Sequence, residues 1–226
     1  MKFTKYNKKI QKNDKTIIYY TANREDPAFE QKIMDNIMAN KGDLPIISVS
    51  QKPIDFGENI CVGDVGVFGL NGFRQMLVAA KAAKTKYVIF TEADFLYPKD
   101  YFEFDPPDEK ECYRHDNVWI AFKDPRFGSY HKKRVSEGAQ ICNRELLIEM
   151  YEKFFEGLPM WCDETTSLKR KEPFYHYPWK WFTGEPCVSF KTGNGLRSMT
   201  NTEKHIQHEA SLPIWGDIKS LRKNYL

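Results

Sequence analysis

The run Tyr87-Val88-Ile89-Phe90 is the feature that most restricts the fold of this 226-residue chain. Four consecutive apolar residues that polar residues follow at once are typical of a strand buried on both faces of a parallel sheet. Parallel strands cannot be joined by tight hairpins and need a crossover connection, usually a helix. The chain must therefore supply helices to cover both faces of such a sheet.

The segments around this run alternate in the required way. Asp26 followed by Pro27 predicts a helix start, because aspartate caps a first turn and proline fits its first position. Gly42 ends that helix, and the glycine-rich stretch Gly57–Gly69 predicts a loop. The other expected helices run from Leu70 to about Lys84 and over Asn143–Phe155, and the expected strands are Thr16–Thr21, Leu44–Ser50, Tyr87–Phe90, Val118–Phe122 and Cys187–Phe190.

We therefore expect an α/β fold in a single domain, with one mostly parallel sheet flanked by helices. Residues 101–134 are irregular and aromatic, and they predict a separate region on the domain. The first 15 residues are polar and rich in lysine, which predicts a frayed start. The residues beyond the glycine turn at 193–195 are interpreted as a polar tail.

Composition limits the possible partners. Lys and Arg number 34 against 31 Asp and Glu, so a protein that binds nucleic acid by charge alone is excluded. Basic clusters at 2–15, 131–134 and 169–171 are expected to be solvated surface, and contact with phosphates is the alternative role for each. The five cysteines are widely spaced and suit a reducing compartment. With no membrane span or signal sequence recognised, we expect a soluble, cytoplasmic protein.

Two carboxylates follow the apolar run directly, at Glu92 and Asp94. In extended chain, side chains two residues apart point to the same side. Such a pair is costly unless water or a cation lies between the two groups, and carboxylate oxygens suit Mg²⁺ or Mn²⁺. The alternative is that Glu92 caps a turn and Asp94 caps the next segment.

The order of strand, helix, strand, glycine-rich loop, helix, apolar strand and acidic-x-acidic triplet resembles the GT-A glycosyltransferase fold over roughly residues 16–200. The resemblance implies a nucleotide-sugar half at about 16–100 and an acceptor half at about 101–226. It also implies that Asp94 binds Mn²⁺ or Mg²⁺ held by a nucleoside diphosphate. Glu92 departs from the family's Asp-x-Asp pattern and is the second expected metal or ribose contact.

The same resemblance implies further donor contacts. The segment after the first strand would hold the nucleoside, and the start of the helix after the glycine-rich loop would face the diphosphate. A helix-start turn is the alternative role for the first segment. The expected residues are Thr21, Ala22, Asn23, Arg24, Gly72 and Arg74, with Lys191 and Arg197 near the last strand.

The acceptor side is expected after the third helix. Asp163 or Glu164 would deprotonate an acceptor hydroxyl in an inverting enzyme, and a surface helix cap is the alternative role for either residue. His205 or His208 would complete the metal site. Aromatic residues around His176, between Tyr175 and Trp181, would form an acceptor platform.

The sequence therefore predicts a metal-dependent transferase that moves a sugar from a nucleoside diphosphate donor, a UDP-sugar, to a hydroxyl. The acceptor would be a glycan or a hydroxylated base in DNA. Two alternatives remain, a sugar nucleotidyltransferase and a non-catalytic carbohydrate- or nucleic-acid-binding module. Residues 21–28 hold one basic residue, Arg24, and no glycine, which argues against the nucleotidyltransferase.

Overall fold

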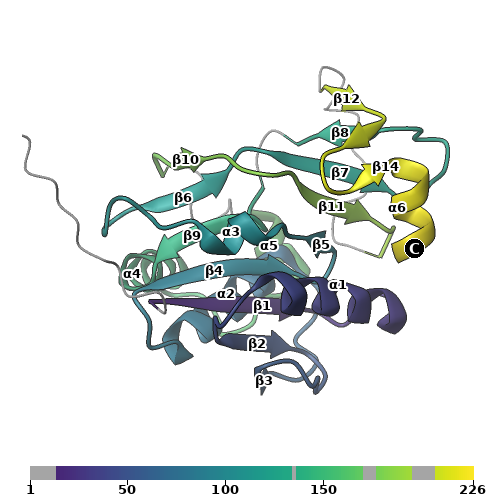
Figure 1. Ribbon diagram of the computed structural model, residues 1–226. Coiled ribbons are helices and arrows are strands. Elements are labelled where there is room, and N and C mark those ends of the chain that lie inside the picture. Colours follow the sequence, from purple (N-terminus) through teal and green to yellow (C-terminus); the bar gives the residue numbers. More distant parts are fainter. Residues whose placement is uncertain (1–13, 134–135, 170–176, 195–206) are drawn as a thin grey trace, which may run out of the picture.

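The computed structural model describes residues 14–133, 136–169, 177–194 and 207–226. Two sheets and six helices make up this part of the chain, together with one short hairpin (Figure 1). The helices are α1 (Pro27–Asn40), α2 (Gly69–Ala82), α3 (Lys99–Glu103), α4 (Arg144–Phe155), α5 (Glu164–Lys169) and α6 (Ile218–Tyr225).

The main sheet has seven strands in the order β10-β6-β9-β4-β1-β2-β3. Four of its neighbouring pairs are parallel, and only β9 runs antiparallel to its two neighbours. The expected α/β fold with a mostly parallel sheet is therefore confirmed. The strands are β1 (Lys15–Thr21), β2 (Ile46–Ser50), β3 (Glu58–Cys61), β4 (Tyr87–Glu92), β6 (Cys112–His115), β9 (Gln140–Asn143) and β10 (Lys180–Phe182).

Burial on both faces explains why β1 and β4 form the centre of this sheet. Ile17 and Ile89 belong to one apolar core, which α1 covers, whereas Ile18 and Val88 belong to the other, which α2 and α4 cover. Figure 1 shows α1 in front of the sheet. Asp26 caps α1 as predicted, since its Oδ1 accepts hydrogen bonds from the backbone N–H groups of residues 28 and 29.

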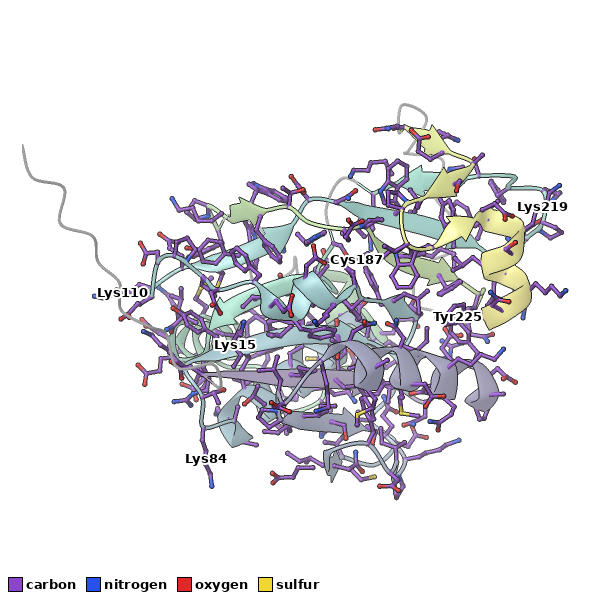
Figure 2. All side chains as sticks on the ribbon, viewed as in Figure 1. Lys15, Lys84, Lys110, Cys187, Lys219 and Tyr225 are labelled. Atoms are coloured by element: carbon purple, nitrogen blue, oxygen red, sulfur yellow. The ribbon has the colours of Figure 1, made fainter. Side chains whose placement is uncertain are left out.

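A second sheet of five strands was not predicted. Its order is β12-β8-β7-β11-β5, and it shares a core with α1 and α6 through Phe190 and Leu221. Cys187, the first residue of β11, is fully buried in the interior of the protein (Figure 2). The strands are β5 (Phe95–Leu96), β7 (Val118–Phe122), β8 (Tyr130–Lys132), β11 (Cys187–Lys191) and β12 (His208–Glu209).

Three sequence-based predictions of local structure are corrected. The expected loop at 57–69 contains β3, because its backbone pairs with the free edge of β2. The irregular region at 101–134 contains the expected strand at 118–122 as β7, but it also supplies β6 and β8 to the two sheets. The polar tail holds β12, a hairpin of β13 (Ser211–Leu212) and β14 (Gly216–Asp217), and α6, which Asp217 caps. Within the described residues, no helix is long and apolar enough to cross a membrane.

Lys15 ties the start of β1 to the segment that follows α3. Its side chain is 7% exposed, and its Nζ donates to the carbonyl oxygens of Phe102 and Phe104 and to Asp105. A buried carbonyl that loses its donor costs about 1–3 kcal/mol.

We therefore expect Lys15→Met to lower the free energy of unfolding by about 1–3 kcal/mol in urea titrations. Lys81→Met is the matched control, because Lys81 is 51% exposed and makes a surface ion pair with Glu152. The control should change stability by no more than about 0.5 kcal/mol. Equal effects of the two substitutions would contradict the anchoring role of Lys15.

Candidate active site

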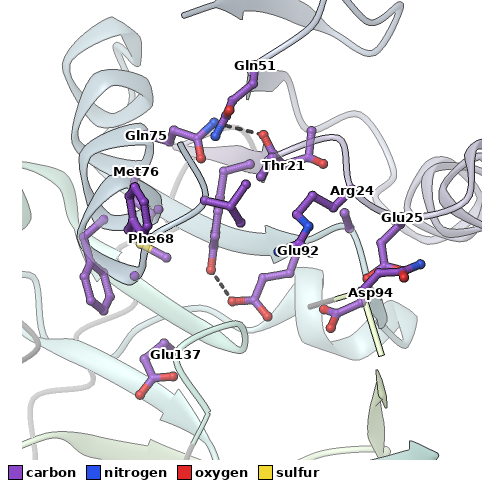
Figure 3. A pocket seen from close by; sticks show the side chains of 18 of the residues that line it. Thr21, Arg24, Glu25, Gln51, Phe68, Gln75, Met76, Glu92, Asp94 and Glu137 are labelled. Carbon is purple, nitrogen blue, oxygen red and sulfur yellow. Dashed lines mark hydrogen bonds between the residues drawn. The ribbon is translucent and has the colours of Figure 1, made fainter. Parts of the chain in front are cut away.

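A cavity of about 620 Å³ lies where β1, β2 and β4 end. Parallel strands bring their carboxyl ends to the same edge of a sheet, and ligands of open α/β sheets bind there. Residues that follow each of these three strands line the cavity (Figure 3). They are Ala22, Arg24 and Glu25 after β1, Gln51 after β2, and Ala93 and Asp94 after β4. A cavity of this size holds a small-molecule ligand.

Glu92 ends β4 and is held firmly at the cavity wall. The Tyr20 hydroxyl donates a hydrogen bond to Glu92 Oε1 (Figure 3). A Cβ atom at Gly138 would lie 2.5 Å from the carboxylate, so a side chain at this position would force the Glu92 carboxylate to shift. Burial raises the pKa of the Glu92 carboxyl, and the nearby charge of Asp94 raises it further.

Asp94 lies two residues further on and carries a side chain that is 19% exposed. Burial raises the pKa of its carboxyl, and Lys191 opposes that rise most strongly. Lys191 Nζ lies 3.9 Å from Asp94 Oδ2, which is the outer limit of an ion pair. Glu25 adds to the rise in the pKa of Asp94, and Figure 3 shows the two side chains in the same part of the cavity.

Negative charge exceeds positive charge in this cavity. Among the described residues that line it, five carry carboxylates and three carry cations. The carboxylates are Glu25, Glu92, Asp94, Glu137 and Glu164, and the cations are Arg24, Lys133 and Lys191. Like charges at close range in a half-buried site are costly unless a cation joins them. The cavity is therefore suited to bind a cation together with its ligand.

The donor set fits Mg²⁺ or Mn²⁺ only when a ligand shares the ion. Within the described part of the chain, no group of three or more His, Cys, Asp or Glu side chains is arranged to hold a metal ion alone. Mg²⁺ is usually bound by one or two carboxylates, with substrate phosphates completing its shell. Asp94, with Glu92 or Glu25, matches that arrangement.

Most of the expected donor contacts meet at this cavity. Thr21, Ala22 and Arg24 line it after β1, and Gly72 lines it from the first turns of α2. Glu92, Asp94 and Lys191 line it as well, and so does Glu164. These residues, which were expected at one site because of their places after the strands and at the start of a helix, thus lie around one cavity.

Other expected site residues lie elsewhere. Asn23 has its Oδ1 occupied by the N–H groups of residues 51 and 52, and Arg74 packs on Phe155 and donates to Pro159. Asp163 accepts from the Thr166 N–H, the cap that was the alternative role. The ring of His208 lies 4.1 Å from that of His131 between β12 and β8. None of these four predicted residues lines the cavity, because each side chain has closer partners.

Arg197, His205, Tyr175 and His176 lie outside the described residues. Of the expected aromatic platform, Tyr177 and Trp179 pack against the core on the α2 side of the sheet. Trp181 is 49% exposed.

Sequence reasoning missed three charged residues of the cavity. Glu25 directly follows the predicted nucleoside segment, so its position after β1 was a usable signal. Lys133 belongs to a basic cluster that was interpreted as solvated surface, and it is half-buried instead. Burial lowers the pKa of the Lys133 ammonium, with Lys191 the next cause. Glu137 had no signal in the sequence beyond its charge.

Comparisons with known proteins give structural likeness only. No protein-family model and no curated protein matches the chain. Among solved structures, the inositol-1-phosphate CTP transferase from T. maritima is 10% identical with a TM-score of 0.49, over 83% of this chain and 93% of that one. S. aureus TarS 1–349 in complex with UDP-GlcNAc is 12% identical with a TM-score of 0.48, over 84% and 60% of the chains.

A third solved structure is the mannosyltransferase PcManGT from Pyrobaculum calidifontis in complex with GDP-Man and Mn²⁺. It is 16% identical with a TM-score of 0.41, over 79% of this chain and 56% of that one. This chain spans only 36% of a longer TarS structure. The three similar structures are thus a mannosyltransferase, a CTP transferase and a protein in complex with UDP-GlcNAc, and all three TM-scores lie below 0.5. Function is therefore inferred from the cavity's own residues.

The raised pKa values have a consequence for stability. The folded protein binds protons at Glu92 and Asp94 more tightly than the unfolded chain does, so stability is lost as the pH rises through the raised pKa values. We expect Asp94→Asn to raise the Tm of the ligand-free protein at pH 7.5 by roughly 2–4 °C, or about 1 kcal/mol in a domain of this size.

Differential scanning calorimetry at pH 7.5 and pH 4 measures this effect. The gain should shrink at pH 4, where the wild-type carboxyls take up protons. Asp35→Asn is the control, because Asp35 lies on the exposed face of α1 away from the cavity. An unchanged or lower Tm for Asp94→Asn at pH 7.5 would show that the charges of Glu92 and Asp94 do not destabilise the folded protein.

Proposed function

We propose that this chain is a glycosyltransferase that moves a sugar from a nucleoside diphosphate sugar, a UDP-sugar, to a hydroxyl acceptor. The observation that carries the proposal is the excess of carboxylates over cations in a half-buried cavity at the ends of β1, β2 and β4. A diphosphate alone would be repelled by this lining. A diphosphate with Mn²⁺ or Mg²⁺ would match it, because the acidic pair would hold the ion and the ion would offset the negative charge of the phosphates.

Different residues of the cavity would bind the ion, the phosphates and the nucleoside of the donor. Asp94, with Glu92 or Glu25, would hold the ion, whose chemistry is to neutralise the negative charge that develops on the leaving diphosphate. Lys191 and Arg24 line the same cavity and supply further positive charge for the phosphates. Thr21 and Ala22 lie at the end of β1, where they would contact the nucleoside.

Glu137 and Glu164 line the cavity from the expected acceptor half, and Glu164 is one of the two residues that the sequence pattern nominated as the base. Asp163 is less suited to the task, because its Oδ1 caps α5. In an inverting reaction, the acceptor oxygen forms a bond to the anomeric carbon and passes its proton to Glu164. The bond from that carbon to the diphosphate oxygen breaks, and the electron pair leaves with the nucleoside diphosphate.

The acceptor would be a glycan or a hydroxylated base in DNA. A base in a duplex must leave the stack to reach a recessed donor. A sugar nucleotidyltransferase is less well supported, because residues 21–28 include one basic residue, Arg24, and no glycine to wrap a triphosphate. A binding module without catalysis would have no use for the acidic pair.

Turnover of a UDP-sugar panel with Mn²⁺, followed as UDP release with mass spectrometry of the acceptors, tests the proposal. We expect release with at least one donor and loss of about 100-fold or more in kcat for Glu164→Gln, within the range ascribed to general bases. The KM for the donor should change little, because Glu164 would touch the acceptor.

Glu145→Gln is the control, since Glu145 is an exposed residue in the first turn of α4. It should leave kcat unchanged. Absence of UDP release with every donor would contradict the proposed function. Full activity of Glu164→Gln with normal inversion would remove Glu164 from the mechanism but not the transferase.

A further inference from the structure

Two polar residues of α2, Asn71 and Arg74, bind the segment between α4 and α5 and do not line the cavity. Asn71, in the first turn of α2, is fully buried. Its Oδ1 accepts the N–H of Cys162 at 2.8 Å, and its Nδ2 donates to the carbonyl of the same residue at 3.0 Å. One side chain thus binds both polar groups of a residue 91 positions further along the chain.

Asn71 also holds the other wall of the cavity. Its Nδ2 donates to the Val65 carbonyl at 2.6 Å, and residues 66–68 line the cavity directly after Val65. On the opposite side, Cys162 is followed after one residue by Glu164, which lines the cavity as well. A single buried amide therefore joins the donor loop to the segment that carries the candidate base.

Two more contacts fix the same segment to α2. Arg74 Nη2 donates to the Pro159 carbonyl at 2.9 Å while its guanidinium stacks on Phe155 at 3.7 Å. Ser167 Oγ accepts the N–H of Leu70 at 3.2 Å and satisfies a donor in the first turn of α2, where the N-cap residue Phe68 makes no side-chain bond. These contacts bracket Glu164 on both sides in the sequence.

We propose that Asn71 is a positioning residue that holds Glu164 at the distance from the donor that proton transfer requires, with Arg74 and Ser167 as its supports. This inference rests on the proposed function. Asn71 is fully enclosed and touches neither donor nor acceptor. It acts through the peptide of Cys162. Reacting groups that are misplaced by about 1 Å can lose 100-fold in rate.

A double-mutant cycle separates this role from a general loss of stability. Groups that act as a unit show strongly non-additive effects on kcat. We expect Asn71→Ala to lower kcat for UDP release about tenfold in the wild-type background, and less than twofold in the Glu164→Gln background. Ser167→Ala, which removes one hydrogen bond, should follow the same pattern with a loss of about threefold. The KM for the UDP-sugar should change less than kcat.

Asn59→Ala is the matched control. Asn59 also bridges segments with its amide, since it binds the hydroxyls of Ser48 and Ser50 and the N–H of Ile54, but it lies on the edge strand β3 and outside the cavity lining. It should lower stability without changing kcat. If the Asn71→Ala chain does not fold, Ser167→Ala alone carries the cycle.

The outcomes are distinct. Effects of Asn71→Ala or Ser167→Ala that multiply with that of Glu164→Gln would overturn the positioning role and leave the transferase standing. The same holds for an effect confined to the KM of the UDP-sugar. A wild-type chain that releases no UDP from any donor overturns the proposed function, and this inference with it.

Discussion

The repulsion between carboxylates at the end of β4 is the constraint on which the rest of the site depends. Glu92 is the last residue of the central strand β4, and Asp94 lies in the turn that follows it. Tyr20 holds Glu92 from β1, and the absence of a side chain at Gly138 leaves room for its carboxylate. The free energy that this pair costs the empty protein becomes available to a cation and a diphosphate, since binding removes the repulsion.

The helix α2 connects that acidic pair to the opposite wall. Its apolar face packs on β1 and β2. Asn71 and Arg74 bind the segment that connects α4 to α5. The donor edge of the sheet and the candidate base are therefore parts of one packed unit. Residues far apart in the sequence can take part in one reaction because three hydrogen-bonded contacts fix their separation.

The position of a residue can be predicted from the sequence when a local pattern determines it, but not when contacts with distant residues determine it. The buried strand at 87–90 and the helix start at Asp26 could be predicted, because an apolar run and a helix cap each depend only on residues that are neighbours in the sequence. Glu92, Asp94 and Arg24 followed from their places after strands. Arg74 donates to Pro159, 85 residues further along the chain, and Lys133 packs over the ring of Phe95; no local pattern contains such contacts. Two strands of the second sheet, at 118–122 and 187–190, were predicted, but their pairing with each other and with β5 was not, because these strands come from distant parts of the chain.

The most direct test of this account is a thermal-shift titration of the wild-type protein with UDP and Mn²⁺, separately and together. A ligand that binds only the folded state raises the Tm according to its concentration and affinity. The repulsion among the carboxylates predicts that UDP with Mn²⁺ stabilises the protein by more than the sum of the two alone, and that EDTA abolishes the effect. Equal stabilisation by UDP with and without Mn²⁺, or none in either case, would contradict it.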